Sequence, residues 1–106
     1  GLPGNLPRML PDGLGAVLEP GGWQLPPVFR WLHEAGEIDV QEMLKTFNCG
    51  IGLVLVVPPA GEAAVRAALA EAGEGEVFRL GTVQPVAGRD SERVRWQGAA
   101  PWRSAP

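Results

Sequence analysis

The sequence predicts an α+β domain, a mixed β-sheet of about four or five short strands with helices packed on it. Its 106 residues suffice for one small domain, and 45% of them are hydrophobic, as in ordinary globular proteins. Two helical patterns fill the first half of the chain, and a strand–helix–strand–strand pattern fills the second. The 11 prolines and 15 glycines predict short, sharply bounded elements.

In the first half we expect a helical turn over residues 5–10 and a strand over residues 14–19. A helix follows that Pro26-Pro27 open and Gly36 closes, since proline is favoured in a first turn and glycine ends a helix. Its inner face comprises Val28, Phe29, Leu32 and Ala35. A second helix begins at the capping pattern Asp39–Glu42. Its apolar stripe comprises Val40, Met43, Leu44 and Phe47.

In the second half, residues 51–57 are apolar throughout, which predicts a central strand covered on both faces. An alanine-rich helix over residues 62–72 follows and stops at Gly73. We expect three further strands, over residues 76–80, 82–86 and 93–96, with the last two at edges. The domain is predicted to span residues 1–98, and residues 99–106 to form a flexible tail.

Composition limits the possible functions. The net charge is −3 without a basic stripe, which argues against nucleic-acid binding. The single cysteine, Cys49, rules out an internal disulfide and a cysteine-based zinc cage. The longest apolar run is too short to cross a bilayer, and no signal peptide opens the chain. We therefore expect a cytoplasmic protein that contacts neither nucleic acid nor membrane.

The strongest candidate site is the corner between the second helix and the strand at residues 51–57. Asn48 tolerates a left-handed backbone and offers a hydrogen-bond donor and an acceptor. Gly50 and Gly52 allow a ligand or another backbone to come close. The alternative is a helix cap followed by a strand entry.

A second candidate site lies at the amino end. Backbone N–H groups around Gly1, Gly4 and Asn5 suit an anion nest, and Arg8 suits a phosphate clamp. The alternative for Arg8 is an exposed helix charge. The chain offers no assignable catalytic residue and no metal ligand set.

Three other residues favour structural roles. Cys49 has no basic partner in the pattern, so we expect a small packing residue rather than a nucleophile. His33 stands in a helix without a triad or metal pattern. Trp23, between glycine and proline pairs, is expected to pack the loop onto the helix.

Three blocks in order resemble the phosphoribosylformylglycinamidine cyclo-ligases, the aminoimidazole ribotide synthetases. These blocks are Gly1-Leu2-Pro3 with Asn5-Leu6-Pro7-Arg8, then Trp23 with Pro27-Val28-Phe29, then Glu42-Met43 with Phe47-Asn48-Cys49-Gly50-Ile51-Gly52. The resemblance extends to about Gly81. The family usually has glutamate where this chain has Gly4, which weakens any role for that position. In the family a His and a Thr precede the glycine-rich loop and both are missing here, so the amino end is expected to be truncated.

The resemblance implies the fold of that family's C-terminal domain and an ATP-dependent cyclo-ligase as the intact enzyme. That enzyme closes the imidazole ring of a ribonucleotide substrate after phosphate activates its formamide oxygen. It further implies that ATP and Mg²⁺ bind mainly outside this chain, on an amino-terminal domain that also makes the homodimer. Gly1, Gly4, Asn5, Arg8, Asn48, Gly50 and Gly52 are then substrate-binding residues. The alternatives are a non-catalytic binding or interaction module on a ferredoxin-like scaffold and the equivalent domain of another superfamily member.

Overall fold

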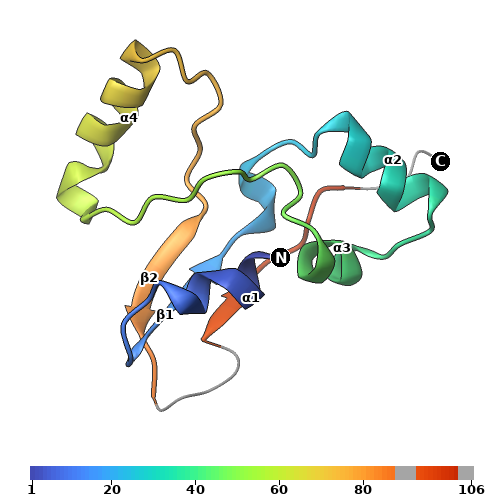
Figure 1. The fold of residues 1–106 in the computed structure, drawn as a ribbon, viewed down its shortest axis with the longest axis horizontal. Coiled ribbons are helices and arrows are strands. Elements are labelled where there is room, and N and C mark those ends of the chain that lie inside the picture. Colours follow the sequence, from blue (N-terminus) through green and yellow to red (C-terminus); the bar gives the residue numbers. More distant parts are fainter. Residues whose placement is uncertain (88–92, 103–106) are drawn as a thin grey trace.

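A computed structural model describes residues 1–87 and 93–102 and confirms the α+β class (Figure 1). Its helices and strands in chain order are α1 (Leu2–Asn5), β1 (Leu14–Leu18), α2 (Pro27–Ala35), α3 (Val40–Thr46), α4 (Glu62–Glu71), β2 (Gly81–Pro85) and β3 (Val94–Trp96). Three 3₁₀ turns lie between them, at Leu6–Arg8, Pro20–Gly22 and Pro59–Gly61.

The sheet is mixed, as predicted, with strand order β2-β1-β3. β1 pairs antiparallel with β2, where Ala16 faces Val83, and parallel with β3, where Ala16 faces Val94. β2 and β3 are therefore the two edges, which agrees with their expected positions. The described residues form three strands. The prediction of four or five was too high.

The first-half helices form where they were predicted. The Asp39 carboxylate accepts a hydrogen bond from the Glu42 backbone N–H at 2.9 Å, which caps α3. On α2, Phe29 packs against the core and lies 6.1 Å from the Phe47 ring, between ring centroids. Val28, placed on the inner face by its spacing, is 58% exposed instead. The predicted turn over residues 5–10 begins earlier, because α1 runs from Leu2 and continues into a 3₁₀ turn.

An aromatic cluster around Trp23 joins the loop after β1 to the carboxyl end of the chain. The Trp23 ring stacks on Phe78 at 5.5 Å and meets Trp102 edge-on at 5.6 Å. Trp102 is only 6% exposed, so residue 102 does not belong to a flexible tail. The rest of the predicted tail, residues 103–106, lies outside the described residues. Trp23 also lies 5.7 Å from Trp96 of β3, between ring centroids. Its described ring contacts are therefore on the strand side of the core, whereas the sequence predicted that it packs the loop onto the helix.

The largest correction concerns residues 51–57. They lie outside the sheet, and Leu53 is 79% and Leu55 51% exposed. The predicted strand over residues 76–80 is also absent. Apolar sequence favours a strand, but a strand forms only beside a partner, and none of the described residues pairs with residues 52–57.

α4, which follows residues 51–57, is not packed into the core. It buries no residue, and with its flanking segments it projects away from α2 and α3 (Figure 1). The radius of gyration is 14.9 Å, against about 13 Å for a compact domain of this length. The helices and strands form, but the core beside α4 is not closely packed.

Candidate functional site

The predicted corner after α3 forms a tight turn over residues 48–51. The Ile51 N–H donates to the Asn48 carbonyl at 3.1 Å. The two central residues have positive φ, +53° at Cys49 and +97° at Gly50. The left-handed conformation that Asn48 tolerates is thus adopted by the residue that follows it. Asn48 instead closes the turn with its side chain, because Oδ1 accepts the Gly50 N–H at 2.9 Å.

Contacts from the loop before α2 hold this turn. The Trp23 Nε1–H donates to the Cys49 carbonyl at 3.0 Å, and that bond is buried. A β-carbon on Gly50 would lie 2.5 Å from Cγ of Pro26, so the turn fits against that ring only with glycine there. Sequence reasoning missed both partners, because they lie more than twenty residues upstream. The hydrogen bond from Trp23 and the packing on Pro26 therefore fix the position of this turn.

In this geometry the amide oxygen and the amide nitrogen of Asn48 have different roles. Its oxygen is used within the turn, whereas the residue is exposed and Nδ2 has no hydrogen-bond partner among the described residues. An amide nitrogen held by a fixed oxygen is a well-oriented donor. The corner can therefore present one N–H donor group to a ligand.

The amino-terminal candidates form a helical turn instead of an open nest. The N–H groups of Gly4 and Asn5 both donate to the Gly1 carbonyl at 3.2 Å. In this conformation those two amides are not available to a phosphate. Gly1 itself packs on the end of α3, where a β-carbon would lie 2.4 Å from the Leu44 carbonyl oxygen. The amino end is thus tied to the same end of α3 that leads into the corner.

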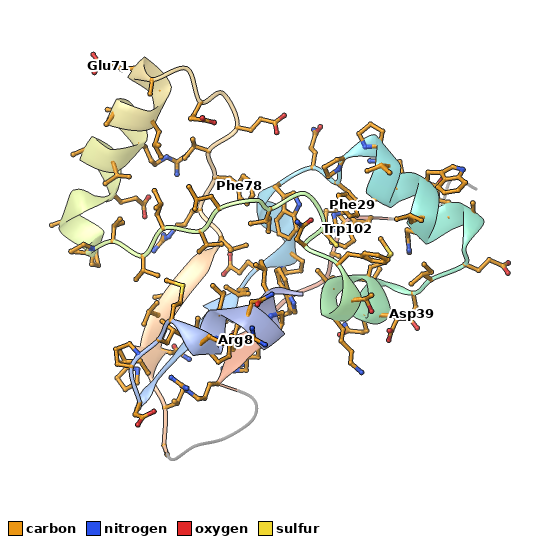
Figure 2. All side chains as sticks on the ribbon, viewed as in Figure 1. Arg8, Phe29, Asp39, Glu71, Phe78 and Trp102 are labelled. Atoms are coloured by element: carbon orange, nitrogen blue, oxygen red, sulfur yellow. The ribbon has the colours of Figure 1, made fainter. Side chains whose placement is uncertain are left out.

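Arg8 is exposed, ends the first 3₁₀ turn and makes no ion pair within the described part of the chain (Figure 2). A free guanidinium beside a helical turn remains compatible with a phosphate clamp. No described contact fixes its direction, so its role stays a prediction.

A cavity of about 720 Å³ opens beside the corner. Gly50 and Gly52 line it, together with Leu6 and Leu10 from the amino-terminal segment. Gly4 lines a separate hollow beside Trp96 and the start of α3. Asn5, Arg8 and Asn48 line neither. The structure thus brings part of the predicted set together and spreads the rest over neighbouring surfaces.

Cys49 is a packing residue, as expected. It is 1% exposed, and its Sγ lies 3.5 Å from the Met43 carbonyl oxygen. Burial raises the pKa of the thiol from 9.0 to about 11, an effect that the positive amino group of Gly1 partly offsets. A thiol that stays protonated at neutral pH is a poor nucleophile. His33 is likewise structural, with Nδ1 against the Ile38 carbonyl.

The described residues hold no metal-binding cluster. Nowhere in residues 1–87 and 93–102 do three histidine, cysteine, aspartate or glutamate side chains gather in a way that suits a metal ion. In the same residues, none of the helices has the length and apolar character needed to cross a membrane.

The chain belongs to the family described as AIR synthase related protein, C-terminal domain, whose profile matches residues 1–93. Among curated proteins it is similar to phosphoribosylformylglycinamidine cyclo-ligases. The relative from Chromobacterium violaceum is 46% identical over 92 residues, which is 87% of this chain and 26% of that protein. The Methylobacillus flagellatus relative is 43% identical over 94 residues, with 89% and 27% covered.

A third relative, from Aromatoleum aromaticum, is 49% identical over 84 residues, which is 79% of this chain and 24% of that protein. The chain therefore spans about a quarter of the length of the curated relatives it matches. The cyclo-ligase resemblance drawn from the three sequence blocks is confirmed at the level of the family.

Proposed function

We propose that this chain is the C-terminal domain of a phosphoribosylformylglycinamidine cyclo-ligase. In this proposal the whole enzyme converts formylglycinamidine ribonucleotide to aminoimidazole ribonucleotide and forms ADP and phosphate from ATP. The observation that supports it most strongly is the 46% identity with a cyclo-ligase over 87% of the chain. The conversion belongs to purine biosynthesis.

Within residues 1–87 and 93–102, no candidate group for ATP or Mg²⁺ is found at the amino end or in a carboxylate cluster. The described part lacks a cluster of metal-binding side chains, and the Gly4 and Asn5 amides are used inside a helical turn. From the resemblance to the cyclo-ligases, we propose that ATP and Mg²⁺ bind mainly on the amino-terminal part of the enzyme, which also makes the homodimer contact.

This chain supplies the ribonucleotide side of the site. Asn48 Nδ2–H donates to a polar group of the substrate, while its oxygen keeps the turn in place. Gly50 and Gly52 line the cavity, and a β-carbon on Gly52 would meet nothing within 4 Å, so that part of the wall is open. Arg8 is the candidate for the substrate phosphate, because guanidinium matches phosphate in a bidentate fashion.

A chimaera tests this proposal. Residues 1–93 replace the matched segment of the Chromobacterium violaceum cyclo-ligase, and ATP-dependent formation of aminoimidazole ribonucleotide is measured beside the parent enzyme. We expect turnover, since the exchanged segments are 46% identical over 92 residues. Sedimentation and thermal melting establish that the chimaera is folded. A folded chimaera that forms no product contradicts the proposal.

A further inference from the structure

One arginine at the far end of the matched segment holds the loop that follows the amino-terminal turns. Arg93 directly precedes β3, and its half-buried side chain reaches the loop over residues 10–14. Nε donates to the Leu14 carbonyl at 2.9 Å, and Nη2 donates to the carbonyls of Pro11 at 2.7 Å and Leu10 at 3.2 Å. A single guanidinium thus binds three backbone carbonyls that lie 79 to 83 positions upstream.

This arrangement suits arginine in particular. Carbonyl oxygens that point at one position repel one another, and a planar cation with several N–H donors offsets that repulsion. Lysine carries the same charge, but it presents its donors from a single nitrogen and does not match this spread of acceptors. The backbone of Arg93 is fixed as well, because its carbonyl accepts the Ala16 N–H at 2.7 Å. The geometry of the loop therefore depends on this guanidinium.

The loop continues directly from the turn that carries Arg8 (Figure 2). That 3₁₀ turn comprises Leu6–Arg8, and the buried side chain of Leu6 ties its beginning to the core. Shortly after Arg8, the Leu10 carbonyl accepts its hydrogen bond from Arg93. The backbone is thus anchored on both sides of Arg8, whereas the Arg8 side chain is exposed.

We propose that Arg93 is a positioning residue that holds the turn carrying Arg8 in place for the phosphate of the ribonucleotide. This inference rests on the proposed function, in which Arg8 binds that phosphate. A guanidinium on an anchored backbone loses less conformational freedom on binding, so its affinity for phosphate is higher. Arg93 acts through the loop and needs no contact with the substrate. Its replacement should weaken ribonucleotide binding and leave the chemical step unchanged.

Arg93→Lys in the chimaera tests this role, since the exchanged residues 1–93 include it. We expect the KM for the ribonucleotide to rise about five- to tenfold, with kcat and the KM for ATP unchanged within about twofold. Arg30→Lys is the matched control, because Arg30 is exposed on α2 and all three constants should stay at the parent values. Sedimentation and thermal melting establish that each variant is folded.

Two further variants sharpen the test. Arg93→Lys is also made in the Arg8→Ala background. It should raise the ribonucleotide KM no further there, because substitutions that act through one group are not additive. Pro11→Gly loosens the loop and leaves the guanidinium in place. We expect it to raise the ribonucleotide KM about threefold, and it supplies the test if Arg93→Lys does not fold.

Three results overturn the proposal. The first is an unchanged ribonucleotide KM in folded Arg93→Lys, or in Pro11→Gly if the lysine variant does not fold. The second is a loss confined to kcat or shared equally by both KM values, as a purely structural role predicts. The third is an undiminished further rise in KM when Arg93→Lys is added to Arg8→Ala.

Failure of the proposed function looks different. If the chimaera forms no product, the Kd for the ribonucleotide, measured by calorimetry, replaces KM in every comparison and still tests Arg93. An Arg8→Ala variant with the parent KM or Kd removes Arg8 from the site and overturns the positioning role with it. A raised value for Arg8→Ala with the parent value for Arg93→Lys overturns this inference alone.

Discussion

Gly50→Ala tests whether the corner after α3 is held as the structure describes. Gly50 has a φ of +97°, and a residue with a β-carbon in that conformation costs roughly 1–2 kcal/mol. The new methyl group would also lie 2.5 Å from Cγ of Pro26, and overpacking of this kind costs about 1–3 kcal/mol. The expected loss in the free energy of unfolding is therefore about 2–5 kcal/mol.

Gly52→Ala is the matched control. Gly52 has no positive φ, and a β-carbon there would meet nothing within 4 Å. Its effect should stay within about 0.5 kcal/mol. Urea unfolding followed by tryptophan fluorescence compares the two variants, since Trp23 binds the turn directly. Gly50→Ala should also lower the Tm by roughly 10 °C or more. Equal stability of the two variants refutes the described turn.

Three further predictions concern the thiol, the phosphate and the reaction. Because burial raises the Cys49 pKa from 9.0 to about 11, only the unfolded chain deprotonates between these pH values, and the free energy of unfolding should fall there by about 2–3 kcal/mol. Urea titrations at each pH should show this slope, and Cys49→Ala should lose it. In the chimaera, Arg8→Ala should raise the KM for the ribonucleotide and leave the KM for ATP nearly unchanged. An unchanged ribonucleotide KM removes Arg8 from the site. The isolated 106-residue chain should show no ATP-dependent turnover. Turnover above a mutant control would contradict the assignment of ATP and Mg²⁺ to the amino-terminal part of the enzyme.

Local patterns predicted the elements that stabilise themselves locally. The cap at Asp39 and the prolines before α2 fix helix ends through contacts within a few residues. The edge position of β2 likewise follows from Pro85, which lacks a backbone donor. These features need no knowledge of distant parts of the chain.

The failed strand prediction has a different cause. The apolar pattern of residues 51–57 indicates strand propensity, but pairing needs a neighbour, and the described residues supply none. Alternation over residues 76–80 was misleading for the same reason. Only the three-dimensional arrangement shows which strands have partners.

The local geometry of the candidate corner could be predicted in part, and its role in binding stays a prediction. Sequence placed a polar turn at residues 48–52, because Asn and Gly favour such corners. It could not assign the left-handed conformation to Cys49, nor find the bond from Trp23, which crosses 26 positions in sequence. The proposed nest at Gly4 and Asn5 overlooked that a short helix uses these amides itself.

The kinetics of two Asn48 variants in the chimaera test the central claim that this corner binds the substrate. Asn48→Asp keeps an oxygen for the Gly50 N–H and removes only the Nδ2 donor, whereas Asn48→Ala removes both. We predict that both variants lower kcat/KM for the ribonucleotide by about tenfold to more than a hundredfold, and that Asn48→Asp retains the parent Tm. Full activity of Asn48→Asp, with loss of stability confined to Asn48→Ala, would show that Asn48 serves the turn alone and would contradict the claim.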